Sequence, residues 1–141
     1  MTSEQIILVK KTWRNIIAIK PEIVADLFYS KLFADTPALR KMFPSKMQEQ
    51  YQKLMDMLNA IVIRLDRLDE LTEEIAAMAQ RHEGYGVRPA HYKLVGSAFL
   101  WTLQKGLGNE WTEEVKTAWT TCYNLLADTM INSTRNNVKT Q

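Results

Sequence analysis

Apolar residues recur at helical spacing along most of this chain, and no segment alternates with the two-residue period of a β-strand. The segment 47–65 shows the pattern well, because its inward positions all fall on one face of a helix. These positions are Gln50, Leu54, Met57, Leu58, Ile61 and Leu65. The polar Gln50 begins an otherwise apolar stripe. The sequence therefore predicts an all-α fold.

Prolines, glycines and capping residues divide the chain into about six to eight helices. Thr2 and Gln5 have the spacing of a capping box, and Pro21 and Pro89 suit first helical positions. The stretch 42–44, "MFP", ends a short helical turn that Pro37 begins, because a residue before proline is pushed out of the α region. Thr72 and Thr112 are predicted N-caps. Residues 132–141 form a polar tail that we expect to fray.

Length and composition favour one folded domain over residues 1–141. The net charge of +2 comes from lysines and arginines scattered along the chain, so we expect no nucleic-acid partner. A single cysteine, Cys122, excludes an internal disulfide and predicts a cytoplasmic protein, with the thiol packed in the core. No apolar run approaches the roughly 18 residues of a membrane span, so we expect no membrane partner.

Three polar residues stand at positions that helical periodicity places inward. His82 ends the apolar face of a helix, just before the turn Gly84-Tyr85-Gly86, while Tyr29 and Gln50 belong to two other helices. Each would cost free energy if buried without a partner. One interpretation is structural: His82 is a satisfied core histidine, Tyr29 bonds a backbone carbonyl and Gln50 a helix terminus. The other is that all three line a shared cavity.

Other site classes find little support. The stretches "GLGNEW" and "GYGVRP" follow helices rather than strands and lack the remaining glycine of a dinucleotide loop. His82 and His91 lie across a helix break and have no zinc spacing with Cys122. His91 falls in the first turn of its helix, off the apolar stripe, so we expect a solvated or capping role.

The order of several short motifs resembles the globins, in particular single-domain bacterial globins related to the haem domain of flavohaemoglobins and to neuroglobin. The resemblance runs from about Ser3 to Ile131. Its markers are "LFYSKLF" with Tyr29, "MFP" with Phe43, "QYQKLM" with Gln50 and Leu54, "RHEGYGV" with His82, "HYKLVG" with Tyr92, and "TEEVKTAWTTCY". Each motif is weak alone, but their order is specific. The resemblance implies a globin fold around a haem pocket.

The resemblance also implies a cofactor, haem b (iron protoporphyrin IX), and a role for individual residues. His82 is the expected proximal iron ligand, with its second ring nitrogen donating to a neighbouring acceptor. The expected haem-binding residues are Phe43, Leu54, Met57, His82, Tyr85, Val87, Tyr92 and Val95. The expected distal residues, which surround a bound gas, are Phe28, Tyr29, Gln50 and Leu54. Lys46 or Lys53 could meet the haem propionates, although exposed lysines are more often simply solvated.

The function implied is reversible binding of oxygen, and of nitric oxide and carbon monoxide, with Tyr29 and Gln50 donating hydrogen bonds to bound oxygen and slowing its release. One alternative is an enzyme, a nitric oxide dioxygenase served by a separate reductase. Another is a gas or redox sensor. One departure matters: flavohaemoglobins pair the proximal histidine with a tyrosine, matched by Tyr92, and a glutamate, but Thr134 falls at the glutamate position. This counts against peroxidase-like activation of O–O bonds.

Overall fold

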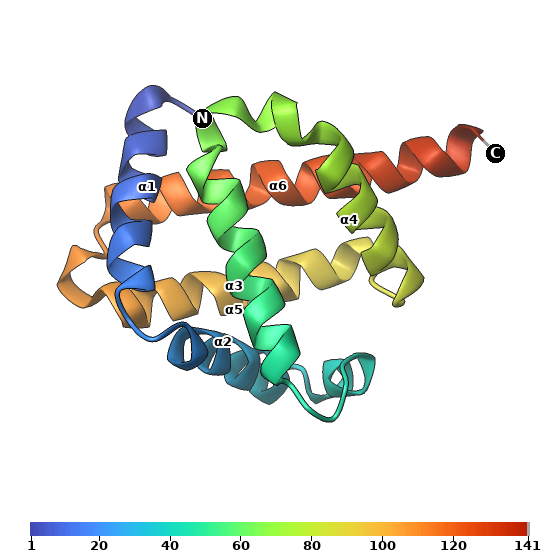
Figure 1. The fold of residues 1–141 in the computed structure, drawn as a ribbon, viewed down its shortest axis with the longest axis horizontal. Helices are drawn as coiled ribbons and strands as arrows, with labels where there is room; N and C mark the ends of the chain where they lie inside the picture. The colour runs from blue at the N-terminus through green and yellow to red at the C-terminus, as the bar shows by residue number, and fades with distance from the viewer. Residues whose placement is uncertain (141) are drawn as a thin grey trace.

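The computed structural model describes the backbone of residues 1–140 and the side chains of residues 1–134. Within this backbone the chain forms six α-helices and three 3-10 helices, without a strand, so the all-α prediction is confirmed (Figure 1). The elements are α1 (Ser3–Ile17), α2 (Pro21–Asp35), η1 (Pro37–Met42), α3 (Gln48–Ile63), η2 (Leu65–Leu71), α4 (Thr72–Gly84), α5 (Pro89–Leu107), η3 (Gly108–Glu110) and α6 (Glu113–Thr140).

Several predicted helix ends are confirmed. The Thr2 hydroxyl accepts from the Gln5 amide at 3.1 Å, and the Gln5 side chain accepts from the Thr2 amide at 3.0 Å, which completes the capping box of α1. Thr112 caps α6 by accepting from the Val115 amide at 3.2 Å. The His91 ring accepts from the Arg88 amide at 2.9 Å, so His91 has the capping role expected of it, at the start of α5.

Two predicted boundaries are wrong. Thr72 is the first residue of α4 and not its cap, because its hydroxyl donates to the Asp69 carbonyl at 2.9 Å in the preceding turn. The helix expected over 47–65 ends at Ile63, and η2 follows with a non-helical residue, Arg67, inside it. Apolar spacing continues through this kink, which is why periodicity alone did not reveal it.

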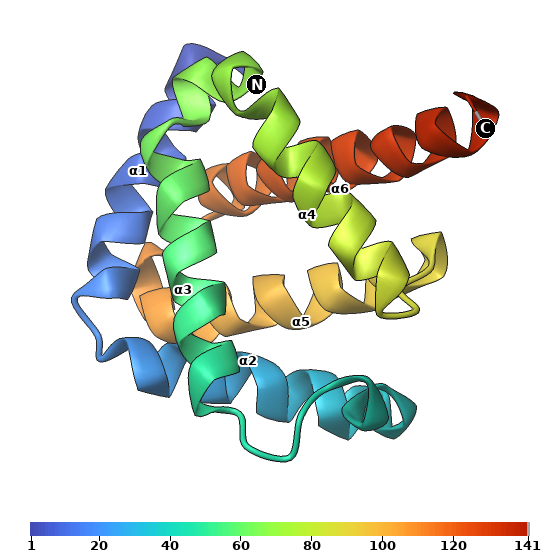
Figure 2. The ribbon, with the colours of Figure 1, turned by 45° about the vertical axis from the view of Figure 1, so that its right-hand side comes forward.

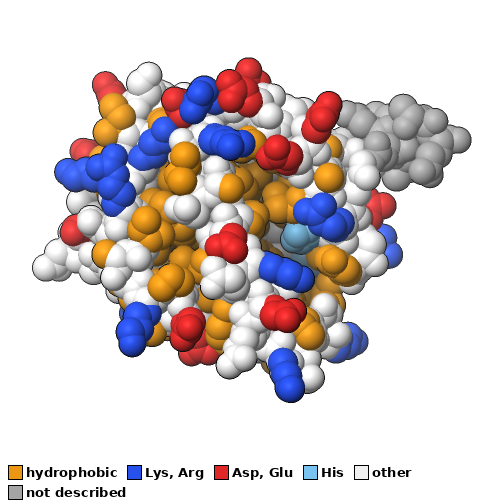
Figure 3. Space-filling model, viewed as in Figure 1, with side chains coloured by type: hydrophobic (Ala, Val, Ile, Leu, Met, Phe, Trp, Pro, Cys, Tyr) orange, Lys and Arg blue, Asp and Glu red, His pale blue; other side chains and the backbone are white. Residues whose placement is uncertain are grey.

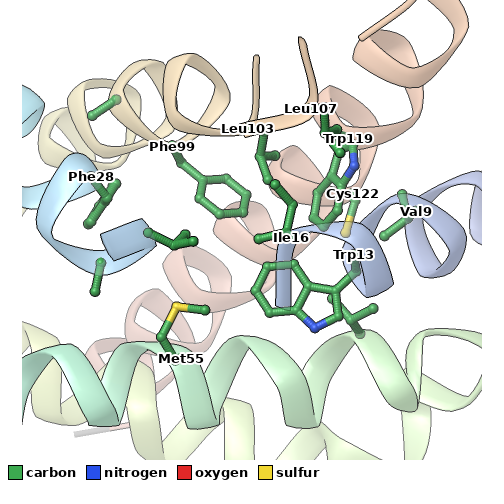
Figure 4. Packing of buried hydrophobic residues seen from close by; sticks show 14 of the residues in the cluster. Val9, Trp13, Ile16, Phe28, Met55, Phe99, Leu103, Leu107, Trp119 and Cys122 are labelled. Atoms are coloured by element: carbon green, nitrogen blue, oxygen red, sulfur yellow. The ribbon is translucent and has the colours of Figure 1, made fainter. Parts of the chain in front are cut away.

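The main hydrophobic core joins α1, α2, α3, α5 and α6 around Trp119, which is 1% exposed (Figure 4). The indole nitrogen of Trp119 donates to the Thr12 hydroxyl at 2.9 Å, and that hydroxyl donates in turn to the Leu8 carbonyl at 2.7 Å. The buried polar groups are therefore satisfied. Cys122 belongs to this core, as expected, and burial raises the pKa of its thiol to about 12.

Helix α4 belongs to a second, smaller hydrophobic cluster. Its buried members are Ile61, Leu71, Ile75, Met78, Ala79 and Met130. In the described part of the chain, α4 packs mainly on α6 and η2 and has at most marginal contact with α3 and α5. Figure 2 shows α3 and α4 diverging from the end at which η2 connects them. The two helices thus present their inner faces to a region between the two clusters.

The predicted tail is only partly described. The backbone of α6 continues to Thr140, so it includes most of residues 132–141. The side chains after Thr134 lie outside the described residues, and fraying of the tail stays a prediction. No helix in the described residues has both the length and the apolar character needed to cross a membrane.

Candidate functional site

Two of the three inward polar residues, Tyr29 on α2 and Gln50 in the first turn of α3, contact each other. The Gln50 amide nitrogen donates to the Tyr29 hydroxyl oxygen at 3.0 Å, and Tyr29 is only 3% exposed. The structural alternative, in which Tyr29 bonds a backbone carbonyl and Gln50 a helix terminus, is not what the structure shows. The buried Tyr29 and the half-buried Gln50 thus form a hydrogen-bonded pair between α2 and α3.

The Tyr29 hydroxyl is held in its neutral form. Burial raises its pKa to about 12, although the hydrogen bond from Gln50 acts in the opposite direction. A neutral phenol has one proton to donate, and Gln50 already donates to the oxygen. The proton of Tyr29 is therefore free to point at a third group.

Aromatic rings surround Tyr29. Phe28 and Phe43 meet its ring edge-to-face at centroid distances of 4.9 and 5.5 Å, so two further predicted site residues lie beside it. Phe33 and Tyr51 stack on it at 5.9 and 5.6 Å. Phe28 is buried and also contacts Phe99. Three of the expected distal residues, Phe28, Tyr29 and Gln50, thus lie together, and the sequence reasoning missed Tyr51 beside them.

His82 lies near the end of α4, half-buried on the same face as Met78 and Ala79. Its Nδ1 atom is 2.7 Å from the Met78 carbonyl oxygen. A carbonyl can only accept, so Nδ1 carries a proton in this contact, and in the singly protonated ring the lone pair is on Nε2. This is the state of a histidine prepared to bind a metal, with its tautomer fixed by the helix itself.

The turn after His82 is hydrogen-bonded to the end of α4 and lies next to η1. The Val87 amide donates to the His82 carbonyl at 3.0 Å, and Gly86 adopts a φ of +96°, which favours glycine. A Cβ atom on Gly86 would lie 3.8 Å from the Met42 methyl, so η1 adjoins this turn. The Tyr85 ring is 6.4 Å from the His82 ring and 66% exposed. Two predicted haem-binding residues, Tyr85 and Val87, therefore lie next to His82.

Four other predicted site residues, Leu54, Met57, Tyr92 and Val95, pack at the margins of the two hydrophobic clusters. Leu54 and Val95 pack against the main core, whereas Met57 and Tyr92 pack against the α4 cluster. All four are only half-buried. Figure 3 shows hydrophobic side chains with a histidine among them on the face that carries α3 and α4. We call these four half-buried side chains the apolar wall.

Tyr92 on α5 is hydrogen-bonded to a residue of α6, Tyr123. The Tyr123 hydroxyl donates to the Tyr92 carbonyl at 2.6 Å, and a Cβ atom on Gly96 would lie 2.6 Å from the Tyr123 ring, so only glycine admits that ring. The pKa of Tyr92 is raised by burial and by the negative charge of Glu83. Thr134 donates to the Ile131 carbonyl at 2.8 Å within its own helix. It supplies no carboxylate to the proximal side.

The two lysines considered for propionate contacts border a groove. Its volume is about 380 Å³, and its lining residues are Pro44, Ser45, Lys46, Gln48, Glu49, Gln50 and Lys53. Gln50 both lines this groove and donates to Tyr29, so the groove borders the Gln50–Tyr29 pair. Propionate contacts of Lys46 or Lys53 stay a prediction.

These residues fit a flat apolar macrocycle that carries its own metal. His82 offers one free nitrogen lone pair, the wall is apolar, and the Tyr29 hydroxyl offers a proton at a second place. In the part of the chain with described side chains, no three of His, Cys, Asp or Glu gather into a site that could hold a metal by themselves. A single histidine suits haem, whose porphyrin supplies the remaining ligands.

The chain is similar to known proteins over most of its length. The family model described as Globin matches residues 26–130. An uncharacterised globin-like protein of Aquifex aeolicus is 32% identical over 131 residues, which cover 93% of this chain and 93% of that protein. A flavohaemoprotein of Vibrio cholerae is 29% identical over 93% of this chain, and the match covers only 34% of that relative's length.

Solved structures share the fold. A bacterial globin of Campylobacter jejuni superposes with a TM-score of 0.81 at 23% identity, covering 98% of this chain and 99% of that one. An engineered carbene transferase, made from a Rhodothermus marinus protein named as a candidate nitric oxide dioxygenase, gives a TM-score of 0.85 at 23% identity, covering 100% and 99%. The fold expected from the resemblance is confirmed.

Proposed function

Because the chain belongs to the globin family, whose members bind haem, we propose that it reversibly binds oxygen at an iron held by His82, with Tyr29 and Gln50 as hydrogen-bond donors to the gas. We propose haem b as the form of the cofactor. The observation that carries the proposal is the hydrogen bond from Gln50 to the buried Tyr29, which leaves the Tyr29 proton available. Nitric oxide and carbon monoxide are further expected ligands, and the cytoplasm is the expected location.

On the proximal side, this proposal rests on the state of the His82 ring. Haem iron supplies the reversible coordination of a diatomic gas. His82 supplies the Nε2 lone pair. Its Nδ1 atom lies 2.7 Å from the Met78 carbonyl oxygen, and this hydrogen bond holds the ring orientation and increases the basicity of Nε2. Phe43, Leu54, Met57, Tyr85, Val87, Tyr92 and Val95 are the residues we propose to contact the porphyrin.

On the distal side, Tyr29 and Gln50 act as a pair. Oxygen bound to ferrous haem would carry partial negative charge, so a hydrogen-bond donor at this place would stabilise it more than it would stabilise a neutral gas. We expect the Tyr29 hydroxyl to be the stronger of the two hydrogen-bond donors, because its burial removes water that would compete for the same hydrogen bond. Gln50 orients the hydroxyl by donating to its oxygen and carries a second amide proton. Phe28 and Leu54 exclude water around the gas. Slow oxygen release is the expected consequence.

A pH series checks the protonation state of Tyr29. The folded pKa of about 12 is above the ordinary value of 10.0, so the neutral hydroxyl is favoured in the folded protein. Its contribution to stability is complete below the ordinary value and is lost as the pH rises toward the folded value. We therefore expect the oxygen dissociation rate, measured by stopped flow, to stay constant from about pH 7 to about pH 10. A rate that rises with a midpoint below about pH 10 would contradict this assignment.

The second candidate function is nitric oxide dioxygenation. The similarity to flavohaemoproteins and to the Rhodothermus marinus protein favours it. In that reaction nitric oxide, oxygen and one electron give nitrate, and a separate reductase must supply the electron for each turnover. The chain spans about a third of the length of the Vibrio cholerae flavohaemoprotein, so a reductase partner is a proposal. Catalytic consumption of nitric oxide that continues only with a reductant distinguishes this function from simple binding.

The test of the proposal is the absorption spectrum of the purified protein in its ferric, ferrous and oxygen-exposed forms. Haem bands with an oxygen complex that persists for minutes support an oxygen-binding protein. Rapid return to the ferric form on exposure to oxygen contradicts tight reversible binding. A colourless protein that takes up no added haem contradicts the proposal altogether.

A further inference from the structure

Tyr51 covers the ring of the distal tyrosine. It follows Gln50 on α3, and its ring stacks on Tyr29 with centroids 5.6 Å apart and planes inclined by only 12°. The neighbouring residues Gln50 and Tyr51 thus hold Tyr29 in two different ways. Gln50 donates to the Tyr29 hydroxyl oxygen, and the Tyr51 ring lies nearly parallel to the Tyr29 ring.

The Tyr51 ring is itself fixed by a bond to α2. Its hydroxyl donates to the Asp26 carboxylate at 2.8 Å, a charge-assisted contact. Asp26 and Tyr29 are three residues apart on α2, so they lie on the same side of that helix. Burial and the hydrogen bond to Asp26 both raise the pKa of Tyr51, which keeps its hydroxyl a donor. Tyr51 therefore connects α3 to α2 at the turn that carries Tyr29.

The orientation of the Tyr29 ring matters for donation. Conjugation with the ring keeps the proton of a phenol close to the ring plane, so the plane decides the directions in which that proton can point. A hydrogen bond weakens steeply as its angle departs from linearity. A side chain that fixes the ring plane of Tyr29 thus also limits the direction of its donated proton.

We propose that Tyr51, held by Asp26, is a positioning residue that fixes the ring plane of Tyr29 and so directs its proton toward the gas. This inference rests on the proposed oxygen-binding function, because the effect of Tyr51 passes through the hydrogen bond of Tyr29. Tyr51 lies outside the set of distal residues that the sequence predicts.

Four variants of the haem-loaded protein separate the parts of this contact. Tyr51→Leu removes the ring, and we expect oxygen to dissociate about threefold faster because Tyr29 donates at a poorer angle. Tyr51→Phe keeps the ring but frees it from Asp26, so a smaller increase is expected, and Asp26→Ala should match it. Asp26→Asn keeps an acceptor oxygen and should restore nearly the original rate.

Infrared spectra of the ferrous carbon monoxide complex supply a readout that general destabilisation does not move. The C–O stretch rises when a hydrogen bond to the gas weakens, so Tyr51→Leu should shift it in the same direction as Tyr29→Phe, and by less. The matched control is Thr12→Val, which also removes a hydroxyl hydrogen bond, the one that Thr12 accepts from Trp119 in the main core. It should lower the unfolding temperature without changing the C–O stretch appreciably.

A double variant tests whether Tyr51 affects oxygen release through Tyr29. With Tyr29→Phe already in place, Tyr51→Leu should change the dissociation rate no further, whereas independent effects would multiply. Multiplying effects, or a Tyr51→Leu protein with the original rate and C–O stretch, would overturn the positioning role. Failure of the proposed function is visible separately, in an original protein without an oxygen complex or a Tyr29→Phe protein with unchanged release. Either result also overturns the role of Tyr51.

Discussion

Replacing His82 with glycine is expected to abolish the normal haem spectrum, or to weaken haem retention at least tenfold, which corresponds to about 1.4 kcal/mol or more. The reason is that His82 offers the one free nitrogen lone pair beside the apolar wall, with its other nitrogen bonded to the Met78 carbonyl. Haem retention is measured by transfer to an apoprotein acceptor. Added imidazole should restore much of the spectrum, because it can occupy the place of the missing ring.

The other histidine provides the matched control. His91 accepts from the Arg88 amide at the start of α5, so His91→Ala should cost a little stability and leave the haem spectrum unchanged. A normal spectrum in His82→Gly without imidazole would remove His82 from the site. Loss of the spectrum in both variants, with both proteins folded by circular dichroism, would show that the method does not distinguish a ligand from a structural histidine.

Replacing Tyr29 with phenylalanine is expected to speed oxygen dissociation about tenfold or more, if its hydrogen bond contributes about 1.5 kcal/mol. The substitution keeps the ring and its contacts with Phe28, Phe43 and Tyr51. It removes only the hydroxyl, and with it the acceptor of the Gln50 amide. Stopped-flow replacement of oxygen by carbon monoxide measures the rate. An unchanged rate in a folded variant would remove Tyr29 from the mechanism.

If oxygen release from the Tyr29→Phe variant is still slowed by a hydrogen bond, we expect Gln50 to be the donor. Gln50 can turn toward the gas once its partner is gone, so Gln50→Leu in the Tyr29→Phe background should speed release again. The two effects are expected to be non-additive because the two side chains share one hydrogen bond. Equal rates in the single and double variants would show that Tyr29 is the only donor.

Helix positions were largely predictable because the signals are local. Capping at Thr2 and Thr112 and the proline starts of α2 and α5 depend on residues within one turn. The failure at Thr72 has an equally local cause, since a threonine hydroxyl can donate backward as readily as it can cap forward. The kink after Ile63 lacks a proline or glycine, so no local signal marked it.

The site was predictable in part. Helical periodicity placed Tyr29, Gln50 and His82 inward, and the resemblance to globins supplied their expected roles. The contact between Tyr51 and Asp26 was not anticipated, although both lie within a turn of a residue already singled out. The spacing in the sequence identified Tyr51 and Asp26 only as ordinary helical positions. A hydrogen bond between two helices produces no periodic pattern in the sequence of either helix.

The sequence by itself determined the helices, the inward faces and the presence of polar residues on those faces, because each depends on neighbours within about four residues along the chain. Only the tertiary structure decided which residues meet: Gln50 with Tyr29, Tyr51 with Asp26, and the wall residues with the margins of the two clusters. The physical reason is that contacts between helices depend on crossing angles and on the kink between α3 and α4, which arise from packing of the whole molecule.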